Sequence, residues 1–225
     1  MTEFTAWRSL VDGEEIVGTP DTVVDDFEWG GPVSDRYSGE TASYDINTDS
    51  PVLEGDFSLK GSGESDNIYS NENDGLDYYP EVGDEVWFWA NPIENDCGPA
   101  VLIFGTGGNP DFFDNGLAVE LNDRDDEFSI FIDGNEEHNP SQSYSLNQWY
   151  LVRIHTAEDD GDLQYQVILH DGPEEQDEVL QDISGTASSS DTINNRTVAF
   201  LSRRADSDYA IDRVVSNPGA GSPDV

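Results

Sequence analysis

Three acidic residues, Asp123, Asp125 and Glu127, alternate along one short segment. Alternate side chains of a strand point to the same face, and two carboxyl groups about 5.5 Å apart can hydrolyse a glycosidic bond as nucleophile and acid. The segment 122–126 reads Asn-Asp-Arg-Asp-Asp, however, which is a turn sequence, and no apolar wall flanks it to raise a carboxyl pKa. We interpret these acids as solvated and expect no catalytic residue.

Two aromatic pairs could bind a sugar, because aromatic faces stack on sugar rings. These are Trp87 with Trp89, and Tyr78 with Tyr79. On a strand the two tryptophans share one face, and the residues between them take the other. The alternative is that the tryptophans form the core between two sheets, as we expect for Trp149. The pattern predicts a carbohydrate-binding site at these four residues and leaves both interpretations open.

Other chemical signals are weak. His138, His155 and His170 share no spacing with one another or with a nucleophile, so we expect surface or strand-end roles. The single cysteine, Cys97, lies in a loop-like sequence and excludes an intrachain disulfide; we interpret it as a packing residue. There is no phosphate-binding glycine loop, zinc spacing or EF-hand sequence.

Acidic residues dominate the charge. Asp and Glu number 49 against nine Lys and Arg, a formal net charge of −40, and Lys60 is the single lysine. Such a surface repels itself in ordinary buffer, whereas at molar salt the Debye length falls to roughly 3 Å. A disordered acidic chain would lack the five Trp, nine Tyr and ten Phe found here. The composition therefore predicts a halophilic folded protein and excludes nucleic acid as a partner.

Short, often alternating apolar runs separated by turn residues are typical of strands. We predict an all-β, two-sheet antiparallel jelly-roll sandwich over 25–215, because nine or ten strands with regular turns suit two packed sheets. Hairpin turns are expected at 122–126 and 158–162. The clearest strands are 57–60, 85–90, 101–104, 117–121, 128–132, 149–154, 165–169, 197–202 and 209–215.

The two ends differ from this pattern. Residues 1–24 are predicted to be an extension whose Trp7, Leu10 and Val11 attach to the domain, a sister subunit or a partner, since exposed apolar side chains are unfavourable in water. Residues 216–225 are rich in Gly, Pro and Ser and are expected to form a flexible tail. We expect neither a signal peptide nor membrane insertion, because no sufficiently long apolar run occurs.

Several segments, taken in order, resemble the concanavalin A-like lectin/glucanase jelly rolls, a superfamily that includes laminin-G-like modules. The resemblance covers about 25–215 and implies the sandwich fold, but its members range from lectins and carbohydrate-binding modules to glycosidases and viral surface proteins. The segments are Asp-Asp-Phe-Glu (25–28), Glu-Gly-Asp-Phe-Ser-Leu-Lys-Gly (54–61), Leu-Ala-Val-Glu-Leu (117–121), Phe-Ile-Asp-Gly (131–134), Gln-Trp-Tyr-Leu-Val-Arg-Ile (148–154) and Tyr-Ala-Ile-Asp-Arg-Val-Val (209–215).

The resemblance also implies particular sites. Similar proteins often hold a structural calcium ion between the first segment and the last strand, at positions that match Glu28 and Asp212. Carboxylates suit calcium, and an ion there would tie together a fold without disulfides. No other cofactor is expected. The glycosidases of the superfamily carry a Glu-x-Asp-x-Glu triplet, and the segment at 123–127 lacks its first Glu.

Three functions remain open. The first is a non-enzymatic structural or adhesion protein on the virion surface of a haloarchaeal virus, as a capsid decoration, turret or tail-fibre subunit. It would be made in the cytoplasm, contact sister subunits or other virion proteins, and reach host glycans. The second is an extracellular glycan-binding lectin or carbohydrate-binding module of a halophilic cell. The third, a glycosidase, has the least support, because the acidic triplet is incomplete.

Overall fold

The structure, a computed structural model, describes residues 8–11, 14–17, 22–47, 49, 51–62, 66–72, 74–105, 116–188, 195–202 and 208–217, with backbone alone for 8–11 and 14–17. These residues form strands and two 3₁₀ helices, η1 (Val33–Asp35) and η2 (Thr41–Ser43). The strands are β1 (Arg8–Val11), β2 (Glu14–Val17), β3 (Thr22–Asp25), β4 (Ser38–Gly39), β5 (Tyr44–Asn47), β6 (Ser58–Gly61), β7 (Asn67–Ser70), β8 (Glu85–Pro92), β9 (Pro99–Gly105), β10 (Leu117–Asn122), β11 (Glu127–Ile132), β12 (Asn135–His138), β13 (Tyr150–Asp159), β14 (Asp162–His170), β15 (Val179–Ala187), β16 (Thr197–Ser202) and β17 (Tyr209–Asn217).

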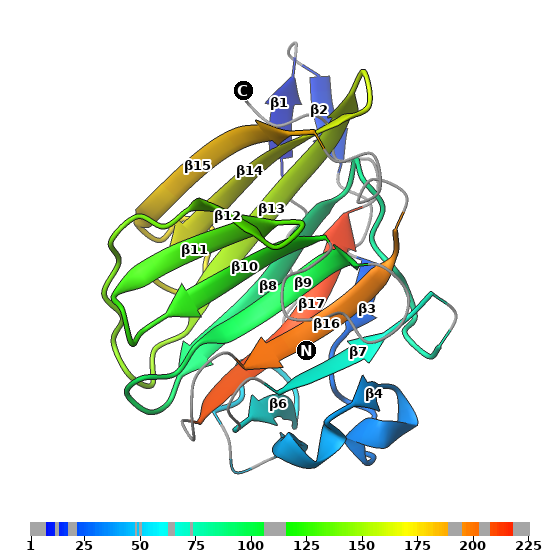
Figure 1. The fold of residues 1–225 in the computed structure, drawn as a ribbon, viewed down its shortest axis with the longest axis vertical. Helices are drawn as coiled ribbons and strands as arrows, with labels where there is room; N and C mark the ends of the chain where they lie inside the picture. The colour runs from blue at the N-terminus through cyan, green and yellow to red at the C-terminus, as the bar shows by residue number, and fades with distance from the viewer. Residues whose placement is uncertain are drawn as a thin grey trace.

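Two antiparallel sheets pack face to face (Figure 1). The seven-stranded sheet has the order β12-β11-β10-β9-β16-β7-β4, and the eight-stranded sheet has the order β15-β14-β13-β8-β17-β6-β5, with β3 also paired to β17. The hairpin β1–β2 forms a separate two-stranded sheet. The predicted all-β jelly-roll sandwich is confirmed, and the sandwich strands run from Thr22 in β3 to Asn217 in β17.

Alternation explains how the sheets bury one face each. On β8, the side chains of Val86, Phe88 and Ala90 point into the space between the sheets. They pack in one buried core with side chains of the other sheet, such as Val119 and Ile130. Burying a large aliphatic or aromatic side chain contributes roughly 1.5–3 kcal/mol, so this layer is the main source of stability. All nine predicted strands are present in the sandwich.

The two predicted hairpin turns are confirmed. Strands β10 and β11 pair up to Asn122 and Glu127, which leaves the acidic turn at 123–126. Strands β13 and β14 pair up to Asp159 and Asp162. The intervening Asp160 and Gly161 both have positive φ, 52° and 90°, which is the conformation that a two-residue hairpin requires.

Cys97 is buried in the core, as predicted for a packing residue. Burial raises the pKa of its thiol to about 12, so that it remains protonated and unreactive at neutral pH. Within the described residues, no helix is long and apolar enough to cross a membrane.

Candidate functional site

Tryptophan side chains gather on the outer face of the eight-stranded sheet. Because β8 alternates, Trp87 and Trp89 point away from the core that holds Phe88. Trp149 lies beside them, just before β13. The interpretation of these tryptophans as core between the sheets is therefore wrong. They form instead a second apolar cluster, here called the tryptophan patch, which consists of Trp87, Trp89, Trp149, Leu53, Leu151 and Val215.

The members of the tryptophan patch differ in exposure. Trp89 is 8% exposed, and its indole N–H donates to the carbonyl of Pro173 at 2.9 Å. Pro173 belongs to the loop between β14 and β15, so this loop fixes the position of the Trp89 ring. Trp87 and Trp149 are half-buried and leave part of their rings open to solvent. The rings of Trp87 and Trp89 meet edge to face, with centroids 6.3 Å apart. This geometry fixes the orientation of Trp87.

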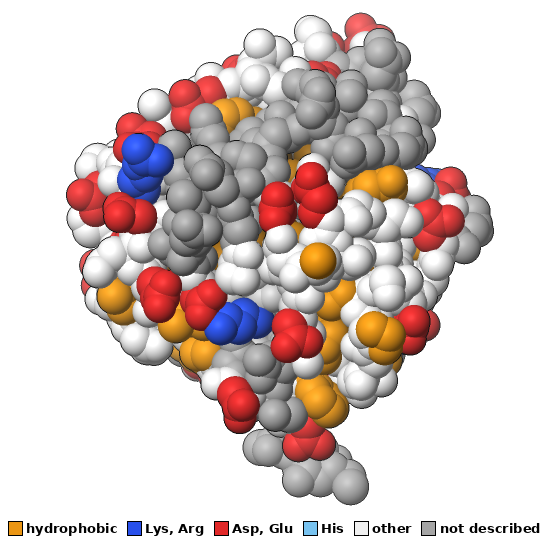
Figure 2. Space-filling view, turned by 60° about the horizontal axis from the view of Figure 1, so that its bottom comes forward, with side chains coloured by type: hydrophobic (Ala, Val, Ile, Leu, Met, Phe, Trp, Pro, Cys, Tyr) orange, Lys and Arg blue, Asp and Glu red, His pale blue; other side chains and the backbone are white. Residues whose placement is uncertain are grey.

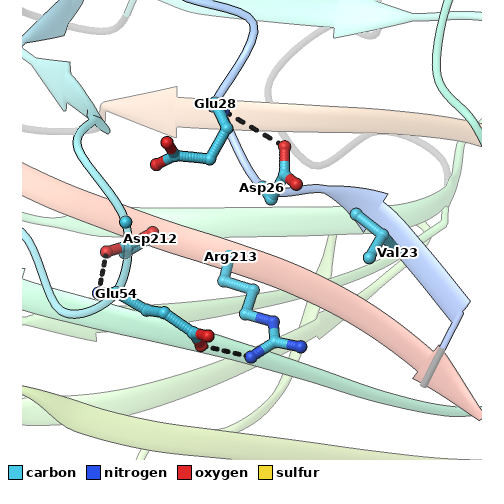
Figure 3. Close-up of a pocket in the computed structure, with 7 residues that line it drawn as sticks. Val23, Asp26, Glu28, Glu54, Asp212 and Arg213 are labelled. Carbon is cyan, nitrogen blue, oxygen red and sulfur yellow. Dashed lines mark hydrogen bonds and ion pairs between the residues drawn. The ribbon is translucent and has the colours of Figure 1, made fainter. Parts of the chain in front are cut away.

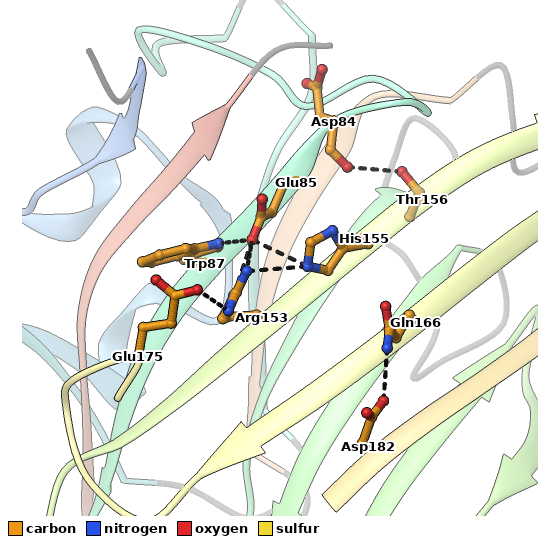
Figure 4. A network of polar contacts seen from close by, with 9 residues as sticks. All are labelled: Asp84, Glu85, Trp87, Arg153, His155, Thr156, Gln166, Glu175 and Asp182. Atoms are coloured by element: carbon orange, nitrogen blue, oxygen red, sulfur yellow. Dashed lines mark hydrogen bonds and ion pairs between the residues drawn. The ribbon is translucent and has the colours of Figure 1, made fainter. Parts of the chain in front are cut away.

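A polar network borders the tryptophan patch (Figure 4). The guanidinium of Arg153 lies over the Trp87 ring, 4.7 Å from its centroid. Its Nε and Nη2 donate to Glu85 Oε1 at 3.0 and 2.8 Å, and its Nη1 donates to Glu175 Oε1 at 2.6 Å. His155 Nε2 lies 3.2 Å from the same Glu85 oxygen. The network places fixed donors and acceptors beside an aromatic ring.

Glu85 is the centre of this network. Burial alone would raise the pKa of its carboxyl, but His155 and Arg153 beside it lower that pKa from 4.5 to about 2. The carboxylate therefore stays charged at any physiological pH and orients both Arg153 and the indole N–H of Trp87, which donates to it. Such a locked ion pair suits recognition better than proton transfer.

Tyr78 and Tyr79 lie apart from the tryptophan patch. Tyr79 is a core residue, 9% exposed, and its hydroxyl bonds to Ser70 at 2.7 Å. Tyr78 packs against the same core and donates its hydroxyl to Asp84 at 2.9 Å. The structure thus separates the two aromatic pairs that the sequence suggested, and the buried Tyr79 ring offers no face for a sugar.

Glu28 and Asp212 line a shallow pocket on the same outer face (Figure 3). The pocket measures about 230 Å³ and is also lined by Asp26, Glu54 and Arg213. Asp212 is paired directly with Trp89 across β17 and β8, so the pocket adjoins the tryptophan patch. Sequence order gave no sign of this proximity.

A β-bulge at Arg213 produces this placement. The register between β17 and β8 shifts between Asp212 and Val214, and Arg213 has a φ of 46°, a left-handed conformation that is uncommon for a residue with a side chain. The extra residue puts Asp212 and Val215, three positions apart, on the same outer face. Val215 joins the tryptophan patch, and Asp212 faces the pocket.

Comparisons with solved structures agree with this architecture. The carbohydrate-binding module CBM66 of Bacillus subtilis aligns with a TM-score of 0.50 and 11% identity over 80% of this chain and 94% of its own. The exoplasmic domain of VIP36 bound to Ca²⁺ and Man3GlcNAc aligns with a TM-score of 0.54 and 11% identity over 84% and 89%. The catalytic domain of a glycoside hydrolase family 131 protein from Coprinopsis cinerea aligns with a TM-score of 0.52 and 9% identity over 91% of this chain and 98% of its own.

The chain therefore shares its sandwich fold with carbohydrate-binding, lectin and hydrolase domains. At these identities the likeness shows the lectin-like fold alone, since similar folds carry both lectins and hydrolases. No protein-family model and no curated protein matches the sequence.

The two positions predicted for a calcium ion, Glu28 and Asp212, line one pocket, and backbone amides bond three of their four carboxylate oxygens. Both Glu28 carboxylate oxygens accept from the backbone N–H of Asp56 at 2.9 and 3.1 Å, and Asp212 Oδ2 accepts from the N–H of Leu53 and Glu54. Asp212 Oδ1 is buried without a partner, which is one free ligand. Across the described residues, no three acidic, His or Cys side chains gather closely enough to hold a metal. A carboxylate oxygen that accepts a hydrogen bond can still bind an ion, so the calcium ion stays a prediction.

The fold should be stable without a metal. We expect a chelator at constant ionic strength to shift the melting temperature by less than about 1 °C, because backbone N–H groups already bond three of the four oxygens of these carboxylates. Thermal melting with EDTA, and with added CaCl₂ as the matched arm, measures this. A clear rise in melting temperature with calcium, lost in Asp212→Asn, would contradict it.

The remaining sequence candidates lie away from the tryptophan patch. Asp123 and Asp125 lie in the β10–β11 turn and Glu127 begins β11; Asp123 accepts the N–H of Asp96 at 3.0 Å. His170 is the last residue of β14 and is 2% exposed, so it has the strand-end role of the two that were expected. Trp7 lies outside the described residues, and Leu10 and Val11 are described as β1 backbone alone, so their attachment role stays a prediction.

Sequence reasoning missed the polar half of the site. Arg153 is one of nine basic residues in the chain and stands between Val152 and Ile154 in a predicted strand. A charged residue in an apolar run signals a buried partner. That signal pointed to an ion pair, but it could not name Glu85, which is 68 positions away.

Proposed function

We propose that this lectin-like domain is a carbohydrate-binding module that uses the tryptophan patch and the Arg153 network. The observation that carries the proposal is the position of Trp87, half-buried on the outer face of a sheet beside an arginine held by two carboxylates. A sugar presents one apolar face and a rim of hydroxyl groups. The aromatic ring suits the face, and the fixed polar groups suit the hydroxyls.

The proposal predicts that Trp87→Ala weakens glycan binding at least about 20-fold in Kd, because truncating a central aromatic anchor typically costs about 2 kcal/mol or more. A glycan array followed by calorimetry on the best ligand, in molar salt, measures the loss. Trp29→Ala is the matched control, since Arg36 also lies over that ring at 5.4 Å but Trp29 packs against the main core. Equal binding by Trp87→Ala and wild type would refute the site.

We propose further that binding proceeds without catalysis. Two of the three alternating acids lie in a turn and the third begins β11, and the ion-paired Glu85 carboxyl, with its pKa held near 2, is a poor proton donor. The solved structures with this fold include both hydrolases and binding modules, so the distinction rests on the acids of this chain. Shorter products after incubation with the bound oligosaccharide would overturn this part.

The charge supports operation at high salt. Asp and Glu side chains are scattered over the face drawn in Figure 2, with few Lys or Arg among them. Screening relieves the repulsion among these carboxylates. We expect the melting temperature to rise by tens of degrees between 0.15 M and 3 M KCl. A flat profile in calorimetry would contradict a halophilic protein.

The virion-surface role remains a prediction from the sequence, as do the haloarchaeal virus and the virion partners that it implies. Carbohydrate binding has the better support, because two of the aligned solved structures are described by their sugar-binding role or bound sugar. The two roles are compatible, since a module on a particle could also bind a host glycan. The binding experiment above does not depend on where the protein resides.

A further inference from the structure

Arg153, which borders the tryptophan patch, has no open edge for a further carboxylate. A guanidinium grips a carboxylate best through two N–H groups along one of its edges. The edge formed by Nε and Nη2 donates to Glu85 at 3.0 and 2.8 Å, and Nη1 on the other edge donates to Glu175 at 2.6 Å (Figure 4). The carboxylate of an acidic sugar would therefore have to displace Glu175 before it could bind this arginine.

Negative charge also exceeds positive charge in this ion group. The single guanidinium of Arg153 faces two carboxylates, those of Glu85 and Glu175. The other permanent cations in the described strands of the eight-stranded sheet are already ion-paired, Lys60 with Asp208 and Arg213 with Glu54. An acidic ligand therefore gains no new ion pair without breaking an existing one, whereas the hydroxyl groups of a neutral sugar can donate to the carboxylates and accept from the guanidinium.

The loop that carries Glu175 is anchored independently of that side chain. This loop, residues 171–178, joins β14 to β15. The carbonyl of Gly172 accepts a backbone N–H of β13 at 3.0 Å, and the carbonyl of Pro173 accepts the indole N–H of Trp89 at 2.9 Å. Because these contacts fix the backbone, the loop should stay in place when the charge of Glu175 is removed. The arginine should stay as well, since it keeps its two bonds to β8.

Selectivity against acidic sugars at high salt requires a charge in contact with the ligand. In dilute buffer the net charge of −40 would repel every acidic glycan, wherever it bound. At molar salt the Debye length is about 3 Å, so distant carboxylates no longer act on a ligand. Glu175 is close enough to do so, because its side chain is 28% exposed and bonds the guanidinium that lies over Trp87.

We infer that the Glu175 carboxylate excludes acidic sugars, and that the glycan bound at the tryptophan patch is uncharged. The inference rests on the proposed function, since it names the class of sugar for the same site. It makes Glu175 a specificity determinant, because its carboxylate occupies the position beside Arg153 that the acid group of a uronic sugar would take. Two carboxylates at that position repel each other, and salt screens them less in a half-buried site than in open solvent.

Calorimetry in 3 M KCl at pH 8 with matched neutral and acidic sugars tests the inference. The probes are cellotetraose, mannotetraose and galactotetraose, each paired with the tetrauronate of the same linkage, in which a carboxylate replaces the hydroxymethyl group. Any other neutral ligand from the glycan array joins the panel with its own uronate. We expect the wild type to bind the neutral member of a pair at least about tenfold more tightly, and Glu175→Gln to bind both members within about threefold.

Glu174→Gln is the matched control, because it removes the same charge from the same loop. The Glu174 side chain is exposed and accepts from Gln176 at 3.4 Å, so this variant should keep the wild-type preference. A wild type that binds a tetrauronate as tightly as its neutral partner, or more tightly, overturns the inference but leaves sugar binding intact. A preference that Glu175→Gln retains, or that Glu174→Gln also loses, overturns it as well. If no array glycan binds at all, the proposed function fails and the inference fails with it.

Discussion

Arg153→Gln is expected to lower the free energy of unfolding by about 3–5 kcal/mol, because it removes the guanidinium that compensates the buried Glu85 carboxylate. Glu85 has a side chain 10% exposed, and Arg153 supplies two of its hydrogen bonds. Glutamine is neutral and cannot compensate that carboxylate. Glu175 loses the same partner but is more exposed, so it can turn to solvent at small cost. Denaturant unfolding in molar salt measures the change.

Arg196→Gln is the control for this experiment. Arg196 forms an ion pair with Glu81, but the two side chains are 33% and 51% exposed. Exposed pairs contribute about 0–1 kcal/mol. Equal losses in the two variants would show that burial of the Glu85 pair adds nothing, which would contradict the prediction. Glycan binding by Arg153→Gln should also fall, since the guanidinium orients Trp87.

Asp212→Asn should remove a large part of the pH dependence of stability between pH 4 and 7. Burial raises the pKa of Asp212 from 3.8 to about 6, with Glu28 and Glu54 adding to the rise against the N–H groups of Leu53 and Glu54. The folded state therefore keeps a proton that the unfolded chain releases. The protonated Asp212 therefore contributes at most about 3 kcal/mol to the free energy of unfolding. This contribution is fully present below pH 3.8 and is lost as the pH rises through 6.

The measurement is the free energy of unfolding at pH 5 and pH 7 for both proteins in the same salt. From pH 5 to pH 7 the free energy of unfolding of the wild type should fall by about 1 kcal/mol more than that of Asp212→Asn. The difference between the two proteins isolates Asp212 from the groups that both share, such as Glu85 with its pKa of about 2. Parallel pH profiles would mean that Asp212 titrates in the ordinary range.

The sequence was sufficient for the interior strands of the sandwich. Strands such as β8, β9 and β10 have one or both faces buried, so their apolar residues recur in the patterns that strands require. Edge strands were missed for the opposite reason. Strand β15 reads Val-Leu-Gln-Asp-Ile-Ser-Gly-Thr-Ala, and with solvent on most of its surface it shows little apolar alternation.

The candidate site was harder to predict, because alternation separates two faces without telling which one meets the other sheet. The tryptophans of β8 were placed on one face correctly, but that face is the outer one. The bulge at Arg213 has no sequence signature, since the residue there is not glycine, yet it decides that Asp212 and Val215 share a face. Pairings across 68 or more positions depend on the whole fold.

Strand β17 ends the described chain but lies inside the eight-stranded sheet, between β8 on one side and β6 and β3 on the other. A ribosome making this protein would release the partners of β17 long before β17 itself. Until β17 has left the ribosome, β8 and β6 cannot complete their hydrogen bonding, and the apolar layer beneath them stays open to water. The domain should therefore fold only after β17 has been made, and slowly, with a need for chaperones that a protein built from local contacts would not have.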